Sequence, residues 1–182
     1  MILVRDTIEQ AKRKAEKICW VVMDVDGVMT DGTVYMFGGI QEGKGYNVKD
    51  GLGIKLWQKA GFKSAVITSR SSENVTERCK DLGITNVFQG VSDKLTALMQ
   101  LFEIHKILPE EICYIGDDLV DIPIMKKVGI SVCVADGVQD AKEVAMMITT
   151  AIGGKGAVRE TIDWLLKQKE LWNKTINEYT GV

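Results

Sequence analysis

The chain has 182 residues, of which 46% are hydrophobic and 26% charged, with a formal net charge of −2. This composition is typical of one globular domain with a full core, and it lacks the basic excess of nucleic-acid-binding proteins. No apolar run approaches the roughly 20 residues that span a bilayer, and the apolar start is too short for a signal peptide. Four dispersed cysteines without a Cys-x-x-Cys pair indicate free thiols in a reducing compartment, so we expect a cytoplasmic protein.

Helical and strand patterns alternate along the chain. In chain order, the predicted elements are a helix (6–18), a strand (19–23), a β-hairpin (28–48), a helix (51–60), a strand (63–68), a helix (72–82), a strand (86–89), a helix (92–105), a strand (111–115), a helix (123–128), a strand (131–134), a helix (138–146), a short extended piece (147–149) and a long terminal helix (157–180). Asp50 is expected to cap the helix that follows the hairpin, and 153–156 is expected to be a mobile loop.

Alternating strands and helices predict a parallel sheet with helices on both faces, which is a doubly wound, Rossmann-like α/β fold. The chain contains no internal repeat, low-complexity tract or Pro-rich linker. We therefore expect a single domain over 1–182, with 28–48 as a β-hairpin flap after the first strand and no cap domain.

Two carboxylates, Asp24 and Asp26, directly follow the first predicted strand. Side chains at positions i and i+2 of an extended chain point the same way, so both should face one pocket at the carboxyl end of the sheet. Close carboxylates require a cation or a proton, and hard oxygen ligands favour Mg²⁺. A polar turn is the simplest alternative. An EF-hand fits poorly, because its twelfth position is Tyr35 and a strand precedes the loop.

Further polar residues follow the other predicted strands: Thr68, Lys94, Asp117, Asp118 and Asp121. Taken singly, Thr68 could be a helix cap, Lys94 a solvated helix residue, and the acidic group a polar turn. A parallel sheet nevertheless gathers all of them at one edge, together with the first two aspartates. The set suits phosphoryl transfer, with one carboxylate as nucleophile, a second as general acid and base, and a lysine and a hydroxyl for the phosphoryl oxygens.

The motifs Asp24-Val25-Asp26-Gly27-Val28-Met29-Thr30, Thr68, Lys94 and Gly116-Asp117-Asp118-x-x-Asp121 resemble those of the haloacid dehalogenase superfamily of phosphatases, in order and in spacing. The resemblance implies that Asp24 is the nucleophile and Asp26 the general acid and base. It implies Mg²⁺ ligands from the Asp24 side chain, the Asp26 main-chain carbonyl and Asp117. Thr68 and Lys94 would hold the phosphoryl group, supported by Asp118 and Asp121.

Three further stretches resemble a capless branch that acts on 3-deoxy-D-manno-octulosonate 8-phosphate in lipopolysaccharide synthesis: Asp50-Gly51-x-Gly53-Ile54, Gln89-Gly90-x-x-Asp93-Lys94 and Gly153-Gly154-x-Gly156-Ala157-Val158-Arg159-Glu160. Relatives acting on sialic-type nine-carbon sugar 9-phosphates share these motifs and remain the alternative. The expected substrate-binding residues are Arg70, Arg78, Lys155 and Arg159. For Arg70, the competing interpretation is an ion pair with an acid such as Glu73.

Two other classes of protein compete with a phosphatase. A phospho-acceptor signalling module also combines acids, a threonine and a lysine, but it needs an aspartate at the tip of its third strand, where this chain has Gln89-Gly90. A non-catalytic relative would not need both Asp24 and Asp26. The apolar hairpin residues Val34 to Phe37 also suggest self-association, and the family resemblance implies a homotetramer.

Overall fold

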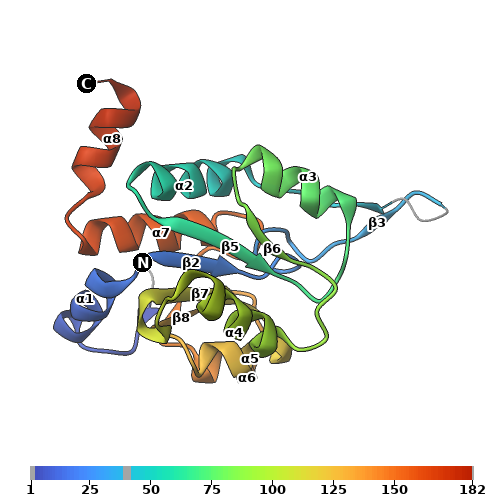
Figure 1. Cartoon of the computed structure of the whole chain (residues 1–182), viewed down its shortest axis with the longest axis horizontal. Helices are drawn as coiled ribbons and strands as arrows, with labels where there is room; N and C mark the ends of the chain where they lie inside the picture. Colours follow the sequence, from blue (N-terminus) through green and yellow to red (C-terminus); the bar gives the residue numbers. More distant parts are fainter. Residues whose placement is uncertain (1–2, 39–41, 182) are drawn as a thin grey trace.

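The computed structural model describes residues 3–38 and 42–181. A seven-stranded sheet lies at its centre, between two layers of helices (Figure 1). In spatial order the strands are β1 (Leu3–Val4), β9 (Met147–Ile148), β8 (Ile130–Cys133), β7 (Ile112–Gly116), β2 (Trp20–Met23), β5 (Lys63–Ile67) and β6 (Asn86–Phe88). All neighbours pair in parallel except β1 and β9, which are antiparallel. The predicted α/β fold is confirmed, with an edge strand β1 that the sequence analysis missed.

Each face of the sheet has its own hydrophobic core. One layer contains α1 (Ile8–Lys17), α2 (Val48–Lys59), α3 (Glu73–Asp81) and α7 (Ala157–Gln168), and the other contains α4 (Lys94–His105), α5 (Ile122–Met125) and α6 (Gln139–Val144). Along β2, Val21 and Met23 pack into the first core, while Trp20 and Val22 pack into the second. Burial on both faces explains why this strand is apolar throughout.

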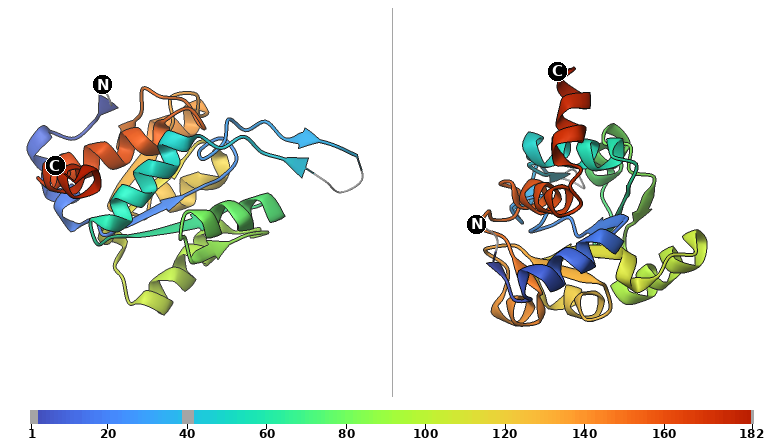
Figure 2. Two further views of the ribbon diagram at one scale, coloured as in Figure 1. Left: turned by 90° about the horizontal axis from the view of Figure 1, so that it is seen from above. Right: turned by 90° about the vertical axis from the view of Figure 1, so that its left-hand side faces the viewer.

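The predicted hairpin is present between β2 and α2. Its strands are β3 (Tyr35–Met36) and β4 (Glu42–Gly43), which pair antiparallel in a separate small sheet. The hairpin extends away from the body of the domain (Figure 2), and the apolar residues Tyr35, Met36 and Phe37 are exposed. The turn glycine Gly39 lies outside the described residues.

Asp50 does not cap its own helix, so that prediction was wrong. Helix α2 begins earlier, and the Asn47 side chain caps it by accepting the Lys49 N–H. The buried Asp50 carboxylate instead accepts the N–H groups of Gly156, at 3.1 Å, and Arg159, at 2.8 Å. Asp50 therefore caps the N-terminus of α7, which is far away in sequence, and so links α2 to α7.

The loop over 153–156 is packed against the segment that follows β2, rather than projecting as the expected mobile loop. The Gly154 N–H donates to the Val28 carbonyl at 2.9 Å, and the Gly153 N–H donates to Asp136 Oδ1 at 2.9 Å. A side chain at Gly153 would overlap the Gly27 carbonyl, so only glycine permits this approach. This loop thus supports the backbone that carries the two strand-end aspartates.

The expected long terminal helix is two helices, α7 and α8 (Trp172–Thr180). The break lies at Glu170, which has a left-handed φ of 59°, and the Leu171 N–H bonds to the Leu166 carbonyl at 2.9 Å. This geometry is a Schellman-type helix end. Glycine usually occupies the left-handed position that ends a helix, and because Glu170 stands there instead, the sequence did not indicate the break.

Across the residues that the structure describes, none of the helices combines the length and apolar character required to cross a membrane.

Candidate active site

A small pocket of about 180 Å³ opens at the carboxyl ends of the central strands. Its lining comes from the ends of β2, β5 and β7 and the start of α4: Asp24, Asp26, Thr68, Ser69, Arg70, Lys94, Asp117, Asp118 and Val120. Residues that are far apart in the sequence therefore meet in one place, as expected for a parallel sheet. Thr68 does not cap a helix, because Ser72 is the residue that directly precedes helix α3. Lys94 is not a solvated helix residue, because it is buried.

Lys94 lies between two buried carboxylates. Its Nζ atom is 2.9 Å from Asp24 Oδ1 and 2.7 Å from Asp121 Oδ1. Burial alone would lower the pKa of Lys94, but the attraction of Asp24 and Asp121 outweighs it and raises this pKa, so the amine stays charged. A buried lysine needs such partners, and it fixes the orientation of the Asp24 side chain in return.

Asp121 acts as a scaffold for this arrangement. Its Oδ1 atom accepts from Lys94 and from the Tyr114 hydroxyl, at 2.7 and 2.6 Å. Its Oδ2 atom accepts the N–H groups of Asp117 and Asp118, at 2.9 and 3.1 Å. Burial raises the pKa of Tyr114, which therefore remains a hydroxyl donor. Both oxygens of Asp121 are thus used inside the protein.

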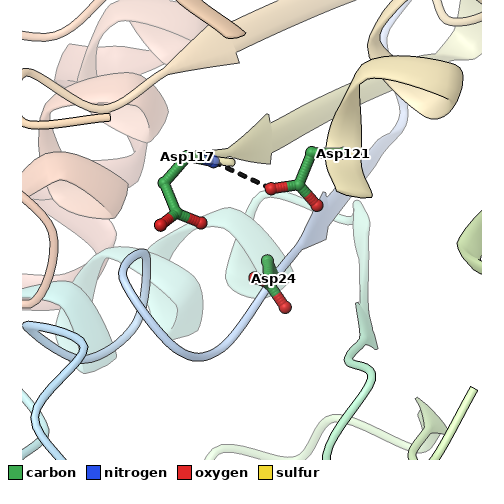
Figure 3. Close-up of side chains that lie close together, drawn as sticks. All are labelled: Asp24, Asp117 and Asp121. Carbon is green, nitrogen blue, oxygen red and sulfur yellow. Dashed lines mark hydrogen bonds between the residues drawn. The ribbon is translucent and has the colours of Figure 1, made fainter. Parts of the chain in front are cut away.

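Asp24, Asp117 and Asp121 bring carboxylate oxygens within 4.8 Å of one another (Figure 3). Burial raises the pKa of Asp24 to about 6, although Lys94 opposes this shift. Burial, followed by repulsion from Asp24 and Asp121, raises the pKa of Asp117 to about 8. Crowded, buried carboxylates of this kind favour a bound divalent cation.

The free ligand atoms of this cluster lie on Asp24 and Asp117. Asp121 is saturated by its four hydrogen bonds, whereas Asp117 Oδ1 is buried without a hydrogen-bond partner among the described residues. An orphaned buried carboxylate oxygen fits a metal ligand. The ligation through the main-chain carbonyl of Asp26 stays a prediction.

Asp26 turns its side chain toward two cations on other segments. Lys44 from the hairpin forms an ion pair with Asp26 Oδ1, and Arg70 Nε lies 3.7 Å from Asp26 Oδ2. Strand β2 ends at Met23, so side-chain partners rather than the sheet hold this carboxylate. Lys44 and its neighbour Glu42 were not predicted as site residues, because their only signal in the sequence is a spacing of two residues on a predicted strand.

Among the predicted substrate-binding residues, only Arg70 lines this pocket in the single chain. It is half exposed and pairs with Glu42 at 2.8 Å, rather than with the acid expected from the sequence, Glu73. Arg78 lies to one side, where it pairs with Asp81 at 2.7 Å and lies over the ring of Tyr46.

Lys155 and Arg159 lie at a different hollow, next to the N-terminus of α7. Lys155 is 3.4 Å from Asp31, and Arg159 is 2.6 Å from Asp163. A contribution of these two side chains to the pocket of the same chain would therefore require movement.

Residues 83–160 match the family model of haloacid dehalogenase-like hydrolases. The chain is 46% identical over 153 residues to 3-deoxy-D-manno-octulosonate 8-phosphate phosphatase of Escherichia coli K12, which covers 84% of this chain and 81% of the relative. The crystal structure of the Yersinia pestis phosphatase of the same name is similar, with a TM-score of 0.88, 40% identity and coverage of 91% of this chain and 89% of that chain.

A crystal structure of 3-deoxy-D-manno-octulosonate 8-phosphate phosphatase from Moraxella catarrhalis is also similar, with a TM-score of 0.90 and 38% identity. The match covers 94% of this chain and 99% of that one, which is a complex with magnesium, phosphate and the sugar acid. The fold and pocket thus belong to a haloacid dehalogenase-like hydrolase, and the described residues include no cap domain. Within that class, the chain belongs to the family of 3-deoxy-D-manno-octulosonate 8-phosphate phosphatases.

The raised pKa values predict that the metal-free protein loses stability as the pH rises. The pKa values of Asp24 and Asp117 are about 6 and about 8 in the folded state, above the ordinary value of 3.8. Ionisation of these two groups therefore lowers the free energy of unfolding as the pH rises from 3.8 to about 8. In the presence of a chelator, Asp117→Asn should unfold at a higher temperature than the wild type at pH 8.5. We expect a gain on the order of 1–3 kcal/mol, because one pKa unit corresponds to about 1.4 kcal/mol and solvent screens part of it.

Thermal unfolding at pH 5.0 and 8.5 measures this effect, and at pH 5.0 the two proteins should differ little. Asp118→Asn is the matched control, since Asp118 is the exposed neighbour at the pocket rim. A variant Asp117→Asn that is no more stable than the wild type at pH 8.5 would contradict the electrostatic strain assigned to the cluster.

Proposed function

We propose that this chain is a magnesium-dependent phosphatase that hydrolyses 3-deoxy-D-manno-octulosonate 8-phosphate to the free sugar acid and phosphate, within lipopolysaccharide synthesis. The observation that carries the proposal is the buried Asp24–Lys94–Asp121 arrangement, with Asp117 and Asp26 beside it in one pocket. Membership of a family named for this reaction supports the substrate. The magnesium, phosphate and sugar acid in the related Moraxella catarrhalis structure support the same assignment.

The pocket supports a two-step displacement. The Asp24 carboxylate attacks phosphorus, the bond from phosphorus to the sugar oxygen breaks, and Asp26 gives its proton to that leaving oxygen. An aspartyl-phosphate on Asp24 results. Asp26 then takes a proton from a water molecule, which attacks phosphorus and releases phosphate from Asp24. Lys94 and the hydroxyl of Thr68 stabilise the phosphoryl oxygens in both steps.

The residues that would hold Mg²⁺ are Asp24 and Asp117, with the main-chain carbonyl of Asp26 as the third protein ligand that the family resemblance implies. When bound, the ion offsets the repulsion between the nucleophile and the phosphate. Asp121 keeps Lys94 in place and orients the turn that carries Asp117, while Asp118 begins the short helical turn behind it.

The first prediction for this mechanism is that Asp24→Asn folds normally and loses nearly all turnover, because an amide is a very poor nucleophile. Removal of Mg²⁺ by a chelator should have a similarly severe effect. Phosphate release from the sugar phosphate, with circular dichroism to verify folding, measures both. If Asp24→Asn kept even a tenth of the wild-type rate, the covalent mechanism would be wrong.

Arg70 is the proposed contact for the substrate carboxylate. It lines the pocket two residues after Thr68, and its guanidinium already binds a carboxylate, that of Glu42, at 2.8 Å. A planar guanidinium is suited to carboxylate recognition. Arg78, Lys155 and Arg159 remain proposed substrate contacts, and in the single chain they lie outside this pocket.

For this substrate, Arg70→Ala should weaken transition-state binding by about 2–4 kcal/mol, measured as a lower kcat/KM, by analogy with the truncation of one partner of a charge pair that the bound substrate buries. A small aryl phosphate without a carboxylate should lose much less. Steady-state kinetics on both substrates, together with a sialic-type 9-phosphate, measure the selectivity. Equal losses on both substrates would place Arg70 in the phosphate site, and preference for the 9-phosphate would favour the nine-carbon alternative.

We further propose that the protein works in the cytoplasm as a homotetramer whose hairpins pack together. The exposed side chains of Tyr35, Met36 and Phe37 support this assembly, since apolar patches on a projecting element usually have a partner. A neighbouring chain would also cover the open pocket and exclude water from phosphoryl transfer.

Light scattering at micromolar concentration should give a mass about four times that of the chain. Replacement of Met36 and Phe37 together by serine should reduce the mass and the activity. A wild-type monomer with full activity would contradict the assembly, because it would show that neither the hairpin nor the pocket needs a neighbouring chain to cover it.

A further inference from the structure

Four charged side chains form a closed ring beside the pocket, and two of them come from strand β4 of the hairpin and the residue just after it. Glu42 Oε2 is 2.8 Å from Arg70 Nη2, and Arg70 Nε is 3.7 Å from Asp26 Oδ2. Lys44 closes the ring through its ion pair with Asp26 and its Nζ atom, 3.8 Å from Glu42 Oε1. The charges alternate in sign around the ring, so each member is stabilised by both neighbours.

The two cations of the ring differ in burial. The side chain of Lys44 is 0% exposed, whereas that of Arg70 is 51% exposed. A lysine amine that is removed from water keeps close to its counter-ions, because separation would leave a buried, unpaired charge. Lys44 therefore restrains the Asp26 carboxyl more firmly than the half-exposed Arg70 does.

The base of the hairpin is anchored to the domain at the same place. The Asn74 side chain, on α3, donates to the Glu42 carbonyl at 2.6 Å, and Arg70 binds the Glu42 carboxylate. Strands β3 and β4 extend away from the body of the domain (Figure 2), but the returning strand β4 is held at the pocket through Glu42. Lys44 thus reaches Asp26 from a fixed segment.

We propose that Lys44 is a positioning residue that holds the Asp26 carboxyl in the orientation required for proton transfer to the leaving sugar oxygen. The inference rests on the proposed function, which makes Asp26 the general acid. Asp26 lies beyond the last residue of β2, so no strand hydrogen bonds fix its backbone in line with the pocket. Lys44 does not itself line the pocket and touches the chemistry only through Asp26.

The test uses leaving groups that differ in their need for a proton. A sugar alkoxide leaves only when it is protonated, whereas p-nitrophenolate leaves as a stable anion. The ratio kcat/KM reports on steps up to the transfer of the phosphoryl group to Asp24, so it isolates this proton transfer. Lys44→Met should lower kcat/KM for the sugar phosphate at least 10-fold, because general acid catalysis contributes typically 10²–10⁴-fold. For p-nitrophenyl phosphate, the loss should stay within about threefold.

Three controls separate positioning from folding. Lys49→Met removes an exposed lysine on α2 and should leave both rates unchanged. Lys44→Arg keeps the charge and should restore much of the sugar-phosphate activity. Adding Lys44→Met to Asp26→Asn should cause little further loss, since the group to be positioned is already absent.

Equal losses of Lys44→Met on both substrates, or no loss on either, would overturn the proposal. If Lys44→Met folds poorly by circular dichroism, Lys44→Gln provides the same comparison. If the wild type hydrolyses another sugar phosphate better, the proposed substrate is wrong, and the leaving-group comparison with that ester still tests Lys44.

Discussion

The active-site arrangement depends on one buried cation, the Lys94 amine, among three carboxylates. Without it, Asp24 would lose the attraction that opposes the effects of burial and of repulsion from Asp121, both of which raise the pKa of Asp24. One amine nevertheless leaves an excess of negative charge around Asp117. That excess explains how a pocket built from acids can attract a divalent cation and, through the cation and Lys94, an anionic phosphate ester.

The two carboxylates that we propose to react, Asp24 and Asp26, are supported by different parts of the molecule. Asp24 is fixed from within the domain by Lys94, which is itself held by Asp121 and the core of the sheet. Asp26 is bound from outside, by Lys44 of the hairpin and by Arg70. The proposed nucleophile is therefore held by contacts with the core, whereas the orientation of the proposed general acid depends on the position of the hairpin.

The sequence predicts the parts of this molecule that have a local signal. Apolar strands and helical periodicity predict the sheet and its layers, and polar residues after each strand predict the pocket, because a parallel sheet gathers its carboxyl ends. Long-range polar contacts have no such signal. The cap that Asp50 provides for α7 and the ion pair of Lys44 with Asp26 depend on tertiary structure. The helix end at Glu170 is local, but it lacks the glycine that would have marked it in the sequence.

The contact between the 153–156 loop and the segment after β2 has a consequence for the order in which the molecule matures. The ribosome makes the two aspartates early, but the backbone beside them is completed by Gly153 and Gly154, and that loop is held by the Asp50 cap of α7. Without α7, the turn at Gly27 and Val28, which follows the two aspartates, would lack this support. Because Asp50 on α2 joins that loop to α7, we expect the turn beside the pocket and the packing of α7 against α2 to form together during folding.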